Sequence, residues 1–289
     1  MDLLPHAFAL SLCAAAACAG APAQAAPLAP HQVIKVCGQE AEWPPFLYFQ
    51  RSLGIKTDEV VGYSAEYLKH ALAARGLRYS IDMIPWRRCM DEVESGHYDM
   101  MTDTSNNAER AAAYLVSKPY YALHLVYFYD EARDKPLVRT AADLKKLRLC
   151  GVNGYNYVPF GLDANQVEHG ARNLAQAFLK LKRNRCDAVP ERLEIALGYK
   201  ALNVVDFDRL DIGFEAVPAL PPVPFHMMVS RKVPYGAELL QLLDAGIEQL
   251  GNDAAARAAI DSRYSIPGVS VGGLLPDPAA KKPAGPKSR

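Results

Sequence analysis

The stretch from Glu94 to Tyr121 constrains the fold most, because it joins a helix end, a short strand, a polar loop and a new helix. Ser95-Gly96 ends the first helix, and the apolar residues from Tyr98 to Thr102 predict the strand. The loop that follows carries Arg110 to the start of the next helix. In an open α/β sheet, ligands bind beyond the carboxyl ends of strands, so Arg110 is placed to hold an anionic group. The alternative is that Arg110 caps its helix or pairs with a surface carboxylate.

The layout of strand, polar turn and helix occurs in both halves of the chain, which predicts an α/β protein with two lobes. A second series of strands and helices opens with the strand at 147–152. Extended segments at 123–130 and 225–230 bracket this series, and we expect them to cross between the lobes as a double hinge, with a cleft between. We therefore predict lobe 1 from residues 32–128 plus 227–266, lobe 2 from residues 134–222, and a disordered tail at 267–289.

The N-terminus has the pattern of an export signal. Phe8 to Ala17 forms an apolar core, and Ala21-Pro-Ala-Gln-Ala25 offers an Ala-x-Ala cleavage site, so residues 1–25 are predicted to be a cleaved signal peptide. The apolar run is too short for a membrane span. Met1 to His6 lacks the Lys or Arg that is typical of a signal. Cys18 offers a lipid-anchoring alternative, but the alanines before it do not fit a lipoprotein pattern.

The charge balance excludes one class of function. Lys plus Arg and Asp plus Glu both number 32, which gives a formal net charge of +0. Nucleic-acid binding needs a basic face or stripe, so no nucleic-acid partner is expected.

The cysteines predict disulfides rather than a metal site. Without the signal peptide, the chain keeps Cys37, Cys89, Cys150 and Cys186. An even number in an exported chain favours disulfides, and two cysteines in each half favour Cys37–Cys89 and Cys150–Cys186. The alternative is free buried thiols. No Cys-x-x-Cys occurs and the histidines are scattered, so neither a metal site nor a cofactor is expected.

Two further side chains are candidates for the cleft. Trp43 precedes two prolines at a strand end, where a rigid aromatic ring would either pack in the core or stack on a ligand. Arg87 and Arg88 begin a predicted helix and point about 100° apart, so at most one of them reaches a cleft easily. Arg88 is retained as the candidate.

Short pieces of the chain match one pattern when they are taken in order: Val33 to Cys37 before Trp43-Pro-Pro-Phe46, Gly62-Tyr63, Ser95-Gly-His-Tyr-Asp99, Glu109-Arg110 with Ser117-Lys-Pro-Tyr-Tyr121, Leu147 to Tyr157, Asn184 to Val189, and Phe225 to Lys232. Together they resemble family 3 of the bacterial extracellular solute-binding proteins, the periplasmic amino-acid-binding type. The resemblance covers about 32–264 and implies the two-lobed periplasmic-binding-protein-like fold of type II. Pro85-Trp-Arg-Arg-Cys89 is similar to a subgroup whose ligands are often unassigned.

The resemblance also implies a set of ligand-binding residues. Arg110 corresponds to the arginine that holds a ligand α-carboxylate, Trp43 to an aromatic on the ligand side chain, and Glu40 to an acidic residue at the pocket edge. Hydrogen bonds at a strand end are implied for Thr102, Asp103, Thr104 and Ser105. The match to a second-lobe loop, whose helix N-terminus faces the carboxylate, consists of Gly154, Tyr155 and Asn156.

Two departures from the family pattern concern the ligand. The loop from Asp99 to Arg110 is one residue shorter than in the usual amino-acid binders. The second-lobe acid that receives an α-ammonium group has Glu191 as its candidate here, with Arg192 one place on, and Asp103 is another source of negative charge. If Arg192 faces the cleft, a dicarboxylate or another anion is favoured over an α-amino acid.

The function that the resemblance implies is capture of a small polar ligand, an amino acid or related organic acid, by closure of two lobes. We expect a periplasmic monomer whose partner is an ABC permease or a receptor in the inner membrane. Two alternatives stay open: a periplasmic enzyme of the same fold, such as a dehydratase, and a ligand-sensing accessory protein. The sequence has no Gly-x-Ser-x-Gly, no His-Glu-x-x-His and no clear acid/base pair, so no catalytic residue is assigned.

Overall fold

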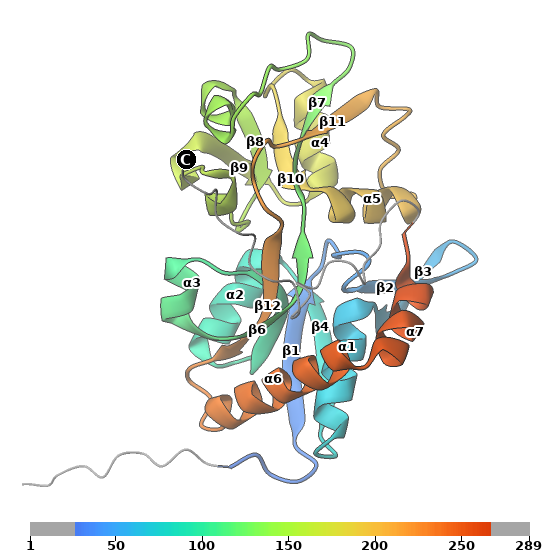
Figure 1. The fold of residues 1–289 in the computed structure, drawn as a ribbon, viewed down its shortest axis with the longest axis vertical. Coiled ribbons are helices and arrows are strands. Elements are labelled where there is room, and N and C mark those ends of the chain that lie inside the picture. The colour runs from blue at the N-terminus through green and yellow to red at the C-terminus, as the bar shows by residue number, and fades with distance from the viewer. Residues whose placement is uncertain (1–26, 267–289) are drawn as a thin grey trace, which may run out of the picture.

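The structure is a computed structural model that describes residues 27–266. The predicted signal peptide at 1–25 and the predicted tail at 267–289 lie outside the described residues. Within the described part, no helix is both long enough and apolar enough to cross a membrane. Helices and strands alternate along the chain and form two lobes, one above the other in Figure 1. The predicted two-lobed α/β fold is therefore confirmed.

The first lobe is built on a five-stranded sheet with the strand order β4-β1-β5-β12-β6. Its strands are β1 (Val33–Gln39), β4 (Arg78–Ile84), β5 (Met100–Ser105), β6 (Tyr114–Leu123) and β12 (Val223–Ser230). β1 is parallel to β4 and β5, whereas β12 is antiparallel to β5 and β6. Every residue of β5 is buried, as expected of a strand in the middle of a sheet that is covered on both faces. Polar Thr102 and Asp103 are thereby held inside the protein.

Helices cover both faces of this sheet, and the C-terminal pair lies on the first lobe (Figure 1). The helices are α1 (Tyr63–Ala73), α2 (Trp86–Ser95), α3 (Ala108–Ala113), α6 (Gly236–Asn252) and α7 (Ala254–Tyr264), and a hairpin is formed by β2 (Tyr48–Ser52) and β3 (Ile55–Val61). α2 ends at Gly96, whose φ of 88° is the left-handed conformation that glycine adopts without strain.

The second lobe has a three-stranded antiparallel sheet, β10-β7-β11, beside the parallel pair β8-β9. Its strands are β7 (Leu125–Asp130), β8 (Leu149–Val152), β9 (Val167–Ala171), β10 (Val189–Arg192) and β11 (Ile212–Ala216). Its helices are α4 (Leu174–Lys182), α5 (Leu193–Ala201) and the 3₁₀ helices η1 (Ala141–Lys146), η2 (Val158–Phe160) and η3 (Ala164–Gln166). A bridge between Leu149 and Ala188 links the two sheets.

The strand pairing corrects the expected course of the two crossings. Residues 125–130 were expected to run between the lobes, but they form β7 and pair with β10 and β11 in the second sheet. β12 begins at Val223 and pairs with β6 from that residue on, so it belongs to the first sheet. The first crossing is therefore at His124, between β6 and β7, rather than at residue 128. The second is at 217–222, between β11 and β12, so residues 225–230, which were also expected to cross, pair inside the first sheet instead.

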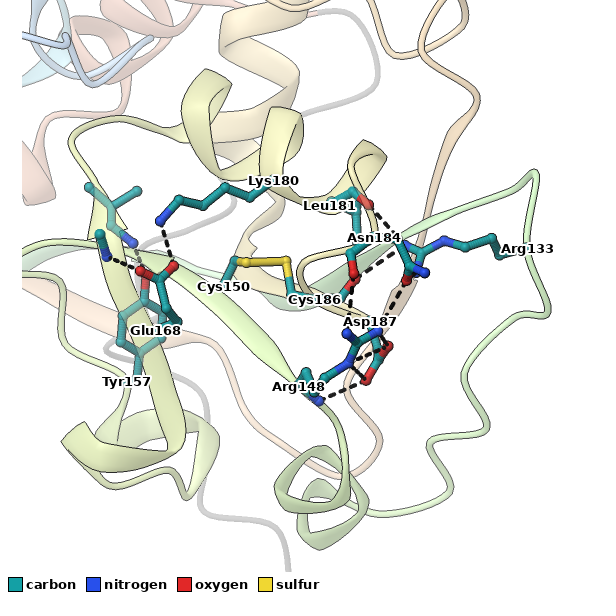
Figure 2. The surroundings of a disulfide bond; sticks show 12 residues. Arg133, Arg148, Cys150, Tyr157, Glu168, Lys180, Leu181, Asn184, Cys186 and Asp187 are labelled. Carbon is teal, nitrogen blue, oxygen red and sulfur yellow. Dashed lines mark hydrogen bonds and ion pairs between the residues drawn. A yellow bond between two sulfur atoms is a disulfide. The ribbon is translucent and has the colours of Figure 1, made fainter.

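Each lobe contains one disulfide, with the predicted pairing. Cys37–Cys89 joins β1 to α2, and Cys150–Cys186 joins β8 to the segment before β10. The second bridge lies beside the ion pairs Arg148–Asp187 and Lys180–Glu168 (Figure 2). The bridges close loops of 52 and 36 residues. Each bridge lowers the conformational entropy of the unfolded chain and so stabilises the folded protein by about 4 kcal/mol.

Candidate functional site

A small cavity of about 30 Å³ lies where the two lobes meet. Its walls are formed by Gly38, Gln39, Trp43, Trp86, Thr102, Asp103, Ser105, Arg110, Phe225 from lobe 1 and Tyr155, Asn156 and Arg192 from lobe 2. An outer hollow of about 300 Å³ shares Arg110, Tyr155 and Asn156 with it. A cavity of about 10–15 Å³ can hold one water molecule, so in this arrangement the space between the lobes has room for only a few water molecules.

Arg110 reaches the cavity from the first turn of α3. Its backbone N–H donates to the Asn107 side chain, which caps the helix and fixes where the arginine begins. Nη1 donates to the Ser105 carbonyl and Nη2 to the Gly154 carbonyl, both at 2.8 Å. The side chain is only 6% exposed and pairs with no carboxylate among the described residues. Burial, and then the charge of Arg192, lower the pKa of Arg110 to about 10.

Arg192 ends β10 and reaches the same cavity from the second lobe. Its Nη2 donates to the Asn156 carbonyl at 2.6 Å, and its guanidinium carbon lies 5.3 Å from the Phe160 ring centroid and 6.0 Å from that of Phe225. Glu191 is equally buried but does not line the cavity, and burial raises the pKa of its carboxyl group. Of the two alternatives left open by the sequence, Arg192 is the one that faces the pocket.

Asp103 lies at the end of β5 with a φ of 61°, a left-handed conformation that Asp tolerates better than most residues. Its carboxylate accepts hydrogen bonds at 2.5–3.0 Å from the hydroxyls of Ser64, Thr102, Tyr120 and Tyr121. Burial raises the pKa of Asp103, and the hydroxyl donors oppose this shift. The carboxylate thus lines the pocket while most of its acceptor capacity is used by the first lobe.

Aromatic rings form much of the remaining wall. Trp43 lies edge-on to Tyr155 with centroids 5.4 Å apart, and its Nε1 donates to the Tyr121 hydroxyl at 3.1 Å. Trp86 begins α2 beyond Pro85 and donates from Nε1 to the Gly154 carbonyl at 3.2 Å. Neither Trp86 nor Phe225 was singled out from the sequence as a site residue, and neither was Gln39. The position of Trp86 just beyond the end of β4 is the signal that could have identified it.

Polar contacts across the cleft hold the lobes together. Asn156 donates to Ser105 Oγ and to the Asn106 carbonyl, both at 3.2 Å, and Gln39 donates to the Tyr155 hydroxyl at 2.7 Å. Gly154 has a φ of 79°, and an added Cβ would lie 3.0 Å from Trp86 Cδ1. The loop of Gly154, Tyr155 and Asn156 is followed by the single 3₁₀ turn η2 and not by the α-helix that was expected there.

Five of the predicted ligand residues lie outside the cavity wall, and Glu191, described above, is one of them. Glu40 is exposed, and Arg88 has a side chain that is 67% exposed and pairs with Glu92 on its own helix. Thr104 is buried, with its hydroxyl donating to the Thr102 carbonyl. Gly154 lines the outer hollow and contributes its carbonyl. Within residues 27–266, no group of three or more His, Cys, Asp or Glu side chains could hold a metal ion.

Residues 35–264 match the family described as bacterial extracellular solute-binding proteins, family 3. The chain belongs to this family. Like other members, it is a solute-binding protein. A comparison with curated protein sequences finds no match.

Solved structures with the same fold include amino-acid-binding proteins and substrate-binding proteins of ABC transporters. The binding protein of a Streptococcus pneumoniae ABC uptake transporter, with bound histidine, is 17% identical with a TM-score of 0.65, over 83% of this chain and 94% of that one. The arginine-, lysine-, histidine-binding protein from Geobacillus stearothermophilus is 20% identical with a TM-score of 0.63, over 80% and 94%. The substrate-binding protein of another amino-acid ABC transporter is 18% identical with a TM-score of 0.64, over 81% and 99%. At these identities the similarity establishes the fold of this solute-binding protein and not its ligand.

Proposed function

We propose that this protein captures a small carboxylate-bearing ligand in the periplasm and delivers it to an ABC permease. The observation that carries the proposal is Arg110, a buried guanidinium in the inter-lobe pocket whose partners are the neutral carbonyls of Ser105 and Gly154. A ligand carboxylate is a stronger, charge-assisted acceptor that can take two N–H groups at once. Family membership and the amino-acid transporters among the similar structures support both the ligand class and the partner.

On this proposal, the protein captures the ligand when its two lobes close around it. With the cleft open, Gly154 moves away with lobe 2 and leaves part of the Arg110 fork free for a carboxylate. Closure then brings Tyr155 and Asn156 over the ligand and excludes water, which strengthens the ion pair. Micromolar binding needs about 8 kcal/mol, and one bidentate ion pair with an aromatic contact and several hydrogen bonds is of that order.

Binding is favoured over turnover because the pocket lacks a free acid/base pair. The Asp103 carboxylate is occupied by hydroxyl donors, and Glu191 does not line the cavity. A general acid or base must reach the substrate within hydrogen-bond distance. Turnover of prephenate-like acids by the purified protein would contradict this part of the proposal.

The Arg110→Gln variant tests the proposal. A thermal-shift screen with amino acids, dicarboxylates and small aromatic acids first selects a ligand, since a ligand at a thousandfold excess over Kd adds about 4 kcal/mol of stability. In calorimetry with that ligand, Arg110→Gln should bind at least about 100-fold more weakly. The variant lacks the guanidinium group that would pair with the ligand carboxylate in a site from which the closed lobes exclude water. Arg88→Gln is the matched control, since Arg88 is exposed on a neighbouring helix, and it should bind as the wild type does.

Circular dichroism and the melting temperature would show that the Arg110→Gln variant is folded. Wild-type affinity in a folded Arg110→Gln protein would remove Arg110 from the site.

A further inference from the structure

Two guanidinium groups from opposite lobes line one small cavity. Arg110 comes from α3 in lobe 1 and Arg192 from the end of β10 in lobe 2. They are 6% and 1% exposed. The Nε–H of Arg192 has no hydrogen-bond partner among the described residues, so this buried guanidinium keeps an unused donor. Two positive charges with spare donors in one water-excluded space favour a ligand that carries more than one negative charge.

The acidic side chains at the pocket offset these charges only in part. Glu191 Oε1 accepts from the backbone N–H of Arg192 at 2.8 Å and from its Nη1 at 3.4 Å, which is long for an ion pair, and Glu191 Oε2 has no partner among the described residues. Glu191 thus offsets part of the Arg192 charge but does not line the cavity. Asp103 lines the cavity, but its carboxylate accepts from hydroxyls on Ser64, Thr102, Tyr120 and Tyr121. An α-ammonium group would therefore find only an acid that already receives several donors, and it would lie beside two guanidinium groups.

We propose that the pocket selects a short organic acid with two carboxylates and no α-ammonium group, an inference that rests on the function proposed above. One carboxylate pairs with Arg110 and the other with Arg192. The carbon chain between them lies against Trp43 and Phe225, whose ring centroids are 5.8 Å apart. An ammonium group at this place would lie beside two guanidinium groups in a buried site, where repulsion is only weakly screened. The carboxylate of Asp103 in the cavity wall already accepts from four hydroxyl groups.

Opening of the cleft supplies the space that such a ligand needs. In the closed arrangement the Arg192 guanidinium fills part of the pocket between Phe160 and Phe225, with its Nη2 on the Asn156 carbonyl. Hinge opening moves Tyr155, Asn156 and Arg192, the lobe 2 residues in the cavity wall, away from Arg110. On the proposal, the lobes then close on the ligand to a wider arrangement than the one described here, and Arg192 pairs with the second carboxylate. Both carboxylates are held only when both lobes contact the ligand.

Matched ligand pairs test the inference, because members of a pair differ only in the α-ammonium group. Titration calorimetry at pH 7.5 would compare succinate with aspartate and glutarate with glutamate, and malonate and adipate would extend the series of chain lengths. At this pH all the carboxylates are ionised. The best dicarboxylate should bind at least about tenfold more tightly than its amino-acid counterpart, which is a modest difference for a charge placed in a buried site.

Three results would overturn the inference. The first is aspartate, glutamate or a neutral amino acid binding as tightly as the best dicarboxylate, which leaves the proposed function intact. The second is sulfate or phosphate binding more tightly than any dicarboxylate, since the aromatic wall would then have no role. The third is that no probe binds at all, although the folded protein binds another carboxylate in the wider screen.

Variants of Arg192 locate the second carboxylate. Arg192→Gln should weaken dicarboxylate binding at least about 30-fold, whereas butyrate, with one carboxylate, should lose no more than about threefold. Arg148→Gln, a second-lobe arginine that pairs with Asp187 on the surface, is the control and should bind as the wild type does. If Arg192→Gln does not fold, Arg192→Lys keeps the charge without the fork and should lose affinity for the dicarboxylate only in part. Unchanged dicarboxylate affinity in either folded variant would contradict the role of Arg192.

Discussion

At the scale of single residues, the pocket contains buried charges that cost stability, as a site that binds the proposed ligand would require. A buried charge is costly unless it is paired with an opposite charge. Arg110 has carbonyl partners, and Arg192 has one carbonyl, two aromatic faces and a long contact to Glu191. Surface ion pairs such as Arg148–Asp187 show the ordinary alternative. The arginines that line the cleft are therefore unusual in their partners as well as in their burial.

Asp103 has a structural role that can be separated from ligand binding. Asp103→Asn replaces one acceptor oxygen by an NH₂ group that faces hydroxyls, while Asn tolerates the left-handed φ of 61° as Asp does. We expect the free energy of unfolding in urea to fall by about 1–3 kcal/mol, the cost of disturbing a buried hydrogen-bond network. Asp208→Asn, at a side chain that is 83% exposed, is the control. Equal stability of the two variants would show that the hydroxyl cluster does not need the carboxylate.

His226 should make the stability depend on pH. Its Nδ1 donates to the Ser117 carbonyl at 2.7 Å, and burial lowers the pKa of the imidazole. The unfolded chain then binds more protons than the native protein below about pH 6.5, so the free energy of unfolding falls as the pH drops. The loss is about 1.4 kcal/mol for each unit by which the pKa is lowered.

Urea unfolding at pH 7.5 and pH 5.5 would measure this effect, with His226→Gln as the comparison. The wild type should lose more stability between the two pH values than His226→Gln does. An equal loss would mean that other groups cause the acid sensitivity.

At the scale of elements, α5 contacts the first lobe next to the pocket. The Tyr199 hydroxyl approaches the carbonyls of Ala41 and Glu42, both at 2.7 Å, so it bonds to the loop that carries Trp43. Gly198 lies one residue earlier, and a Cβ built on it would lie 2.4 Å from the Pro44 carbonyl oxygen. The helix can approach this loop only because the residue at 198 has no side chain.

Gly198→Ala should therefore prevent full closure of the lobes. We expect ligand affinity to fall at least about tenfold, because a backbone carbonyl cannot move aside as a flexible side chain can. Small-angle scattering should show a larger radius of gyration in the presence of ligand than for the wild type. Gly251→Ala is the control, since Gly251 also lies in a helix but a Cβ there meets nothing within 4 Å. Normal closure and affinity in Gly198→Ala would contradict the role of this contact.

Much of the fold could be predicted from local signals. Apolar runs predicted β5 and β8, Gly96 predicted the end of α2, and the even cysteine count predicted both disulfides. The hairpin β2–β3 and the strands β9 and β11 were not predicted. The crossings were harder to place because Leu125–Asp130 has the same extended, apolar character whether it crosses a hinge or pairs inside a sheet. Its role depends on partners at 189–192 and 212–216, which local sequence does not reveal.

A site residue could be predicted only where a polar side chain directly follows a buried strand. Arg110 follows a buried strand within a polar loop, and that pattern identified it as a candidate. Glu191 and Arg192 could not be separated, because neighbouring strand residues point to opposite faces and a shift of one residue exchanges them. Phe225 resembles any core aromatic in a strand, and it reaches the pocket only through the pairing of β12 with β5.

At the scale of the whole molecule, the pocket exists only because two lobes close on each other. The two crossings, at His124 and at 217–222, are the places where the chain can bend. Glu194 is buried beside the first crossing, where its carboxylate accepts from the His124 backbone N–H at 3.0 Å and contacts the imidazole. This contact anchors one side of the hinge to lobe 2, so that bending is confined to few residues.

A crystal structure of the protein with the acid that raises its melting temperature most would test the central claim most directly. The expected result is closed lobes with a ligand carboxylate on the Arg110 fork, at N–O distances of about 2.7–2.9 Å. Gly154 should then no longer be the acceptor of Arg110 Nη2. A ligand bound outside the inter-lobe cavity, with Arg110 still on the Ser105 and Gly154 carbonyls, would contradict the account.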